Sequence, residues 1–212
     1  MQSVLIYVTV ILVAGCLFAG TKLTRRLPRI WLWSMLSLAL IVYAVLLLTQ
    51  VEAWLISDIA VLLVAILGAA AIGTTLSTSS ALIVFCIAAG LVDFFSFSGG
   101  LTAKIIADYE TGQNLLLQYL SISVPLPGRI TPLIGIGDLI ILGSVYYALQ
   151  GLGHNGWRAY LVPLGGLLIA LGVGLRIGGV YAIPFIGAAT IIFLVMNRKE
   201  GASQTMDSAG SG

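Results

Sequence analysis

Charged side chains are scarce in this sequence. Only 8% of the 212 residues are Asp, Glu, Lys or Arg, whereas about a quarter of the residues of a soluble domain are charged. Hydrophobic residues make up 59% of the chain. The ten basic residues barely outnumber the eight acidic ones, which excludes the basic footprint of a nucleic-acid-binding protein. The composition therefore excludes an ordinary soluble domain and predicts a protein of the lipid bilayer.

Cysteine and histidine are also rare, with two residues and one residue. Cys16 and Cys86 both fall within apolar stretches, so we expect free thiols rather than a disulfide framework. The segment "LVAGC" at 12–16 is similar to a lipoprotein cleavage box, but no Lys or Arg precedes it and the apolar run continues beyond Cys16, which favours a plain first helix. His154 lies in the loop "GLGHNGWR" and is expected to be solvated.

Long apolar stretches dominate what is present. Each approaches the roughly 20 residues that a helix needs to cross a hydrocarbon core of about 30 Å. The seven stretches run at about 3–20, 30–49, 54–73, 80–98, 131–150, 157–175 and 179–197. They lack the shorter runs of alternating polarity that mark transmembrane β-strands. The sequence thus predicts an all-α, polytopic transmembrane bundle of about seven helices, with one domain over residues 1–197.

Two segments lie outside these stretches. The first is 99–130, which we expect to be an extramembrane loop. Apolar residues at helical spacing in its first half favour an amphipathic helix on the membrane surface. Prolines at 125, 127 and 132 remove backbone donors and favour an extended or turned second half. The second segment, 198–212, is small and polar, and we expect a disordered tail.

Two acidic residues interrupt the apolar stretches. Six of the eight acids can be placed at or outside the membrane boundary: Glu52, Asp58, Asp108, Glu110, Glu200 and Asp207. Asp93 and Asp138 remain, each with a glycine three residues earlier, Gly90 and Gly135. An ionised Asp at mid-helix costs about 2.5–3.5 kcal/mol on insertion scales. Because neither stretch contains Lys, Arg or His, the two acids are predicted to meet each other.

Depth in the membrane agrees with this pairing. The fourth stretch ends five residues beyond Asp93, and the fifth begins near Thr131, seven residues before Asp138. At about 1.5 Å per residue, both acids lie roughly 8–10 Å inside the same membrane face. Two carboxylates a few Å apart cannot both ionise comfortably, so they share a proton. That arrangement suits an aspartic protease, in which one carboxyl activates water and the other polarises a peptide carbonyl.

The motifs around both acids resemble those of the presenilin and signal peptide peptidase family of intramembrane aspartyl proteases. "GIGD" at 135–138 is similar to the family's Gly-x-Gly-Asp signature, and "LVDFFSF" supplies the first acid with Val92 where the family usually has Tyr. The following "SGGLTAKIIADYETGQNLL" is also similar to presenilins. "YAIPFIG" is the counterpart of the family's Pro-Ala-Leu motif, with Pro184 matching and Phe185 and Ile186 replacing the other two residues.

The resemblance covers about residues 80–197 and implies roles for particular positions. It implies catalytic roles for Asp93 and Asp138 and motif roles for Gly135, Gly137 and Pro184. It also implies that substrate docks as an added strand along "VPLPGRITP" and near the last helix. The implied substrate-binding residues are Val124, Pro125, Leu126, Arg129, Phe185 and Ile186. Since family members have nine helices, the resemblance implies a shortened form.

We therefore expect an intramembrane aspartyl endopeptidase that uses a water molecule and no metal or organic cofactor. Its expected partners are transmembrane peptide substrates and the lipid bilayer, with homo-oligomerisation left open. One enzymatic alternative is a prepilin-type peptidase, which shares Gly-x-Gly-Asp but usually has a Lys soon after it; "GDLIILGSVYY" has none. The alternative from another class is a small transporter that uses both aspartates as ion or proton ligands.

Basic residues also predict an orientation. Lys22, Arg25, Arg26 and Arg29 crowd the first loop, so the positive-inside rule places that loop in the cytoplasm. Alternating crossings then put the two aspartates near the outer face. By the family resemblance, this orientation implies type II single-span substrates or signal-peptide remnants. We expect a multi-pass protein of a prokaryotic cell membrane.

Overall fold

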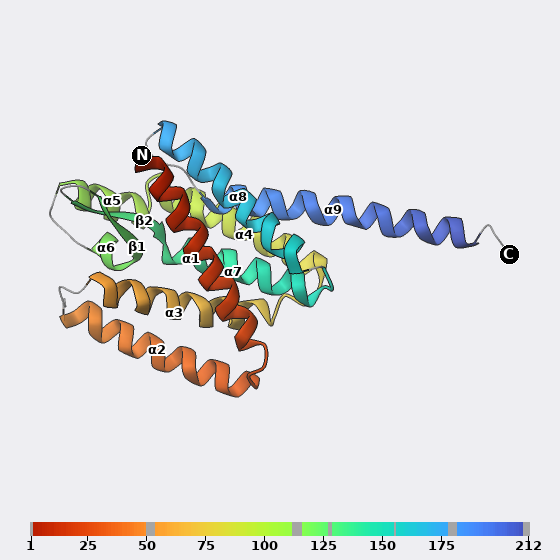
Figure 1. The fold of residues 1–212 in the computed structure, drawn as a ribbon, viewed down its shortest axis with the longest axis horizontal. Coiled ribbons are helices and arrows are strands. Elements are labelled where there is room, and N and C mark those ends of the chain that lie inside the picture. Colours follow the sequence, from red (N-terminus) through yellow and green to blue (C-terminus); the bar gives the residue numbers. More distant parts are fainter. Residues whose placement is uncertain are drawn as a thin grey trace.

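The computed structural model describes residues 2–49, 54–111, 116–126, 129–154, 156–177 and 182–209. Within these ranges the chain forms a helical bundle with one β-hairpin (Figure 1). This confirms the predicted all-α class. Seven helices correspond to the seven predicted apolar stretches: α1 (Gln2–Thr24), α2 (Arg29–Thr49), α3 (Trp54–Gly73), α4 (Ser79–Phe97), α7 (Ile136–Gly151), α8 (Gly156–Ile177) and α9 (Ala182–Ala209).

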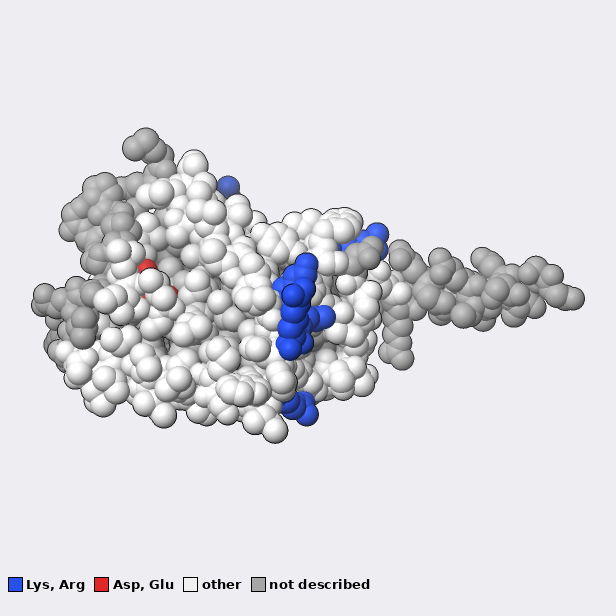
Figure 2. Space-filling view, turned by 60° about the horizontal axis from the view of Figure 1, so that its bottom comes forward, with Lys and Arg blue, Asp and Glu red and all other residues white. Residues whose placement is uncertain are grey.

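Five of these helices, α1, α2, α3, α4 and α8, are long and apolar enough to cross a membrane. The α7 helix and the apolar part of α9, Ala182–Asn197, are shorter. With 16 residues, α7 is about 24 Å long. The outer surface carries exposed apolar side chains such as Ile30 and Leu48, which are 80% and 84% exposed, and Figure 2 shows few charged residues on it. These features support the prediction of a membrane protein.

Successive long helices alternate in direction. In Figure 1, the N-terminus lies at the same end of the bundle as the hairpin, and the α1–α2 loop lies at the opposite end. We call these the hairpin end and the basic end, because Arg25 and Arg29 belong to the second. Arg25 donates a hydrogen bond to the carbonyl oxygen of Tyr147 and lies over its ring, 4.5 Å from the centroid. The first loop is thereby fastened to the last turns of α7.

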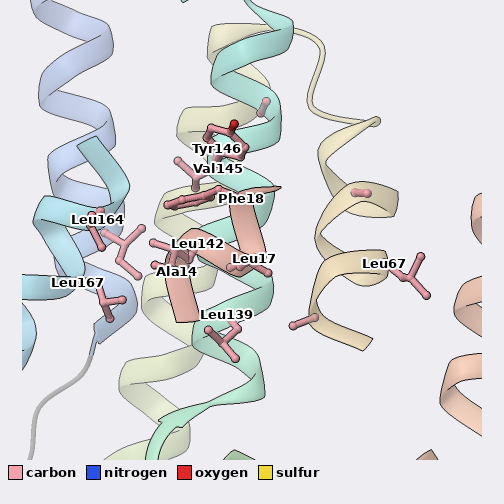
Figure 3. Packing of buried hydrophobic residues seen from close by; sticks show 14 of the residues in the cluster. Ala14, Leu17, Phe18, Leu67, Leu139, Leu142, Val145, Tyr146, Leu164 and Leu167 are labelled. Atoms are coloured by element: carbon pink, nitrogen blue, oxygen red, sulfur yellow. The ribbon is translucent and has the colours of Figure 1, made fainter. Parts of the chain in front are cut away.

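The core is built around α7. Figure 3 shows Leu17 and Phe18 of α1 beside Leu142 and Val145 of α7. On its other side α7 lies against α3, where a Cβ added to Gly143 would come within 2.6 Å of the Ala69 Cβ. Lipid tails are as apolar as leucine, so close backbone approach at small residues holds membrane helices together. The part of α7 that follows Asp138 is therefore firmly packed.

The segment between α4 and α7 contains α5 (Leu101–Glu110), α6 (Leu116–Tyr119), β1 (Ser121–Leu126) and β2 (Arg129–Gly135). The helix expected in the first half is confirmed by α5, and the extended second half is confirmed by β1. The strands pair antiparallel from Ser121 with Gly135 to Leu126 with Arg129. Residues 131–135, expected to open the fifth helix, instead belong to β2. Proline 132 favours extended backbone before it, and pairing with β1 satisfies the strand's polar groups.

The last helix continues into the polar end of the chain. The structure has α9 as helix to Ala209, and Figure 1 shows it extending beyond the other helices. The segment 198–212, for which the sequence predicts a disordered tail, thus includes the end of α9, and residues 210–212 lie outside the described ranges.

Candidate functional site

Both membrane aspartates lie at the hairpin end of the bundle. Asp93 precedes the end of α4 at Phe97 by four residues, and Asp138 is the third residue of α7. They therefore sit about 6 Å and about 3 Å from the ends of their helices. The predicted start of the second of these helices near Thr131 was wrong, because residues 131–135 belong to β2, and Asp138 therefore lies nearer to the end of its helix than expected.

The position of Asp138 explains why a carboxylate interrupts this apolar run. Gly135 is the N-cap residue of α7, and its backbone N–H donates a hydrogen bond to the Asp138 carboxyl group. This is the reach-back half of a capping box, made by the third residue of a helix. The first turn also favours negative charge because backbone N–H groups are exposed there. A Cβ at Gly135 would lie 3.4 Å from Asp138 Oδ2, so glycine leaves the carboxyl group unobstructed.

Asp93 is held from another direction. The backbone N–H of Ile183, at the start of α9, donates to its carboxyl group. The second oxygen, Oδ2, is buried and has no hydrogen-bond partner among the described residues. Asp93 also lies close enough for its charge to act on Asp138. Two half-buried carboxyl groups from different helices thus lie in one region of the bundle.

A cavity of about 250 Å³ opens beside Asp93. It lies between α4, α5, α7 and the start of α9, and the residues that matter most for its chemistry are Asp93, Ser96, Thr102, Gly137, Ile140 and Ile183. The hydroxyl groups of Ser96 and Thr102 are 2.7 Å apart and join α4 to α5. The volume can hold several water molecules, each of which occupies about 30 Å³ in the liquid. The cavity therefore provides room for water or for a short piece of backbone next to a carboxyl group.

The motif glycines play different parts. Gly137 is exposed, and a Cβ placed on it would have no atom within 4 Å. It therefore leaves space at the cavity. At Gly90 a Cβ would lie 3.7 Å from the Pro184 Cα. The α9 helix thus comes close to α4 one turn before Asp93.

The start of α9 is tightly held between two helices. On the α8 side, a Cβ added to Gly166 would come within 2.7 Å of the Ile186 Cα and the Phe185 carbonyl oxygen. On the α4 side, a Cβ on Gly187 would lie 3.3 Å from the Cys86 carbonyl oxygen. Pro184 lies against Gly90, one turn before Asp93 in α4, Phe185 is half-buried, and Ile186 is fully buried in the core. As placed here, Ile186 packs the bundle, and substrate could reach it only if α9 moved.

The other residues implied to bind substrate belong to the hairpin. Val124 is buried at 6% exposure. Pro125 and Leu126 are in β1 and Arg129 is in β2, but their side chains lie outside the described part of the structure. The hairpin leads directly into α7, and Ile136 N–H donates to the Leu120 carbonyl oxygen at 2.9 Å. An extended backbone thus ends at Gly135, three residues before Asp138.

Two contributors to this region are not anticipated from the sequence. Asp58, expected to flank a loop, is the fifth residue of α3, and its Oδ1 accepts a hydrogen bond of 3.1 Å from Ser123 N–H of β1. The backbone N–H of Ile183 bonds Asp93. A signal for Asp58 was present, because it lies one turn inside an apolar stretch. The contact made by the Ile183 N–H could not be predicted, because a backbone group leaves no pattern in the sequence.

At the basic end, His154 lies between α7 and α8, and its ring meets Phe193 edge to face at 4.9 Å between centroids. It is half-buried rather than fully solvated. Burial and the positive charge of Arg158 lower the pKa of His154 below its ordinary value. A second cavity, of about 360 Å³, adjoins it and is lined by Ser79, Ser80 and Asn197 among others. It is at the opposite end of the bundle from the two aspartates.

The structure thus gathers Asp93, Asp138, Gly137 and Pro184 in one region, with the hairpin leading into it. Ile186 lies apart in the core. Comparisons of the chain with protein-family models, with curated proteins and with solved structures find no match.

Proposed function

We propose that this protein is an intramembrane aspartyl endopeptidase that hydrolyses peptide bonds in or near transmembrane helices, with Asp93 and Asp138 as its catalytic pair. The observation that carries the proposal is the placement of two carboxyl groups on antiparallel helices, close enough for the charge of Asp93 to act on Asp138, with Asp93 lining a cavity. None of the cavity-lining residues in the described part of the chain is Lys, Arg or His. The motif resemblance around both acids adds support.

The reaction follows from one shared proton. The ionised carboxylate takes a proton from water as the water oxygen bonds to the peptide carbonyl carbon. The protonated carboxyl group gives its proton to the carbonyl oxygen, so a neutral tetrahedral diol forms. When the C–N bond breaks, the leaving nitrogen takes a proton from one carboxyl group, and a diol hydroxyl returns its proton to the other. The pair ends with the single proton with which it began.

Backbone donors would hold the two carboxyl groups during this cycle. Gly135 N–H fixes Asp138 and Ile183 N–H fixes Asp93. Each bond engages one side of a carboxyl group, and the unpartnered Asp93 Oδ2 remains to meet a water molecule. Positioned groups of this kind lower the barrier because little reorganisation is needed during reaction.

The hairpin offers a way to present the substrate. A peptide bond inside a helix is shielded by the helix's own hydrogen bonds, so the substrate must unwind before attack. An extended segment can replace the lost bonds by joining a sheet edge. By the family resemblance, Val124, Pro125, Leu126 and Arg129 would line this docking strand, with Pro184 and Phe185 on the α9 side. The continuity of β2 with α7 would bring the unwound segment toward Asp138.

The orientation of the bundle bears on substrate choice. Lys22, Arg25, Arg26 and Arg29 lie at the basic end together with Arg158, whereas Lys104 and Arg176 lie toward the hairpin end. The positive-inside rule then places the basic end in the cytoplasm and the aspartates near the outer face. The proposed substrates are therefore type II single-span proteins or signal-peptide remnants in a prokaryotic cell membrane.

The test uses the purified protein in liposomes with a fluorescent reporter that contains one transmembrane helix. We expect cleavage by the wild type, labelling by an aspartyl-protease transition-state analogue, and loss of both for Asp93→Ala and for Asp138→Ala. General acid–base catalysis is typically worth about 10²–10⁴-fold, so the residual rate should be at least 100-fold lower. Asp108→Ala, in α5, is the matched control and should retain activity.

Three outcomes would contradict the proposal. Near-normal cleavage by either aspartate variant, with contaminating protease excluded, would remove that residue from the catalytic pair. Proton or ion flux that is abolished by Asp138→Asn, with no cleavage of any helical reporter, would indicate a transporter. Cleavage confined to a prepilin-type leader would indicate the other Gly-x-Gly-Asp peptidase class.

A further inference from the structure

Asp58 is a third acidic side chain close to the hairpin, and the proposed reaction does not use it. It lies in α3, whose membrane-spanning window has a mean hydropathy of 2.5, the highest among the five spans. A carboxylate in such a helix is costly unless its charge finds a partner. The partner here is a backbone donor, the N–H of Ser123, at 3.1 Å from Oδ1. Asp58 therefore connects α3 to β1 through one specific hydrogen bond.

That bond reaches β1 where its pairing is irregular. The register of the hairpin shifts between Ile122 and Ser123, and Ser123 stands opposite Pro132. Proline has no backbone N–H to donate across the ladder, so this point of the hairpin is weakly held from the β2 side. Ser123 is buried at 4% exposure, and its hydroxyl oxygen has no partner among the described residues. The Asp58 carboxylate thus supplies a contact where the sheet itself is weakest.

The same helix also holds α7. Ser144 Oγ on α7 donates to the Ile140 carbonyl oxygen of its own helix at 2.7 Å and also lies 3.3 Å from the Ala69 carbonyl oxygen of α3. Gly68 of α3 faces the Ile140 side chain, which would lie 3.6 Å from an added Cβ. The hairpin is joined to α7 by the chain itself at Gly135 and Ile136. Asp58 therefore closes a triangle in which α3, the hairpin and α7 are each connected to the other two. Its bond limits how far the hairpin can tilt or slide relative to Asp138.

We propose that Asp58 is a positioning residue that fixes the hairpin on α3, and through it the register in which a substrate strand is presented to Asp93 and Asp138. This rests on the proposed peptidase function. A one-residue slip of a strand moves a different peptide bond to the same place and turns every side chain to the other face. Loss of the Asp58 bond is therefore expected to change which peptide bonds are cut, in addition to how fast.

The experiment compares three variants in liposomes. Asp58→Leu keeps a similar volume and removes the acceptor, Asp58→Asn keeps an acceptor oxygen at the same place, and Ile59→Leu puts a leucine at the neighbouring, lipid-exposed position as a control. Amide hydrogen exchange of the peptide covering 120–126 is measured together with the masses of the products from the helical reporter. For Asp58→Leu we expect exchange about tenfold faster and additional product masses displaced by one or more residues. Asp58→Asn and Ile59→Leu should match the wild type in both readouts.

The two proposals can fail separately. If the wild type cleaves no helical reporter, the peptidase function fails, and faster exchange in Asp58→Leu alone would still support the hairpin contact. If the wild type cleaves and Asp58→Leu gives the same product masses, the positioning role is overturned, whether or not the total rate falls. Exchange in 120–126 that is unchanged in Asp58→Leu would overturn the contact itself.

Discussion

Gly135 and Gly137 stand two residues apart and serve different purposes. Gly135 caps α7 and bonds Asp138 through its N–H, while Gly137 leaves open space at the cavity. The sequence motif presents them as equivalent small residues, and only the helix start at Ile136 separates their roles. The same helix contains Gly143, where the absence of a side chain serves packing against Ala69. Glycines on one helix can therefore be tested against one another.

Gly137→Leu is expected to abolish most of the cleavage activity while leaving thermal stability close to that of the wild type, because the new side chain would occupy the cavity beside Asp93 rather than the core. Gly143→Ala should instead lower thermal stability first, since its Cβ would come within 2.6 Å of the Ala69 Cβ. Overpacking of this kind costs about 1–3 kcal/mol. Thermal unfolding in detergent and reporter cleavage measured on the same samples separate the two. A Gly137→Leu protein with full activity would show that the cavity is not used.

His154 provides a pH prediction. Burial and Arg158 lower its pKa in the folded protein, so the unfolded chain binds the proton more readily. As pH falls below about 6.5, the ordinary value of an exposed histidine, the unfolded state gains protons first and the folded state loses relative stability. The loss stops growing once pH falls below the pKa of the folded protein. We expect His154→Gln to show a smaller decrease in melting temperature between pH 7 and pH 5 than the wild type. Parallel pH profiles for the two proteins would contradict this.

At the level of elements, the seven apolar stretches predict the helices well because length and hydropathy suffice to mark a membrane helix. Residues 131–135 could not be separated from the helix that follows, since a short apolar run has no periodicity that distinguishes strand from helix. Their extended conformation depends on pairing with β1, a contact between segments that a local pattern does not contain. Asp93 and Asp138 were predictable as a pair because neither has a basic partner in its own helix. Asp58 was misplaced because it lies only one turn from a helix start.

The close packing of the start of α9 between α4 and α8 can also be tested by mutation. Gly166→Ala would place a Cβ 2.7 Å from the backbone of Ile186, so α9 must shift. We expect a loss of about 1–3 kcal/mol in stability and a decrease in cleavage, because the Ile183 N–H would move away from Asp93. Gly165→Ala is the matched control, since a Cβ there has no atom within 4 Å. If the two variants have the same melting temperature and the same cleavage rate, α9 tolerates the shift.

For the whole molecule, the alternation of the helices makes the orientation testable. With the basic end in the cytoplasm, a reporter that is active only in the cytoplasm should be active when fused after residue 212 and inactive when inserted after Thr111, next to the hairpin. If the shorter helices α7 and α9 cross the membrane together with the five long ones, seven crossings separate the N-terminus from the C-terminal side of α9. An inactive, externally accessible tag at 212 on a correctly inserted protein would reverse the orientation, and the expected substrates would change with it.

The contact between Arg25 and the end of α7 makes the two ends of this helix differ in rigidity. Arg25 holds the Tyr147 carbonyl and ring, and the residues from Leu139 to Leu149 are mostly buried between neighbouring helices. The first turn, by contrast, has an exposed Gly137 and a half-buried Asp138. Local opening is easiest where burial and contacts are fewest. The helix is therefore most firmly held at its basic end, and its first turn, which contains Gly137, is the part of α7 that opens most easily.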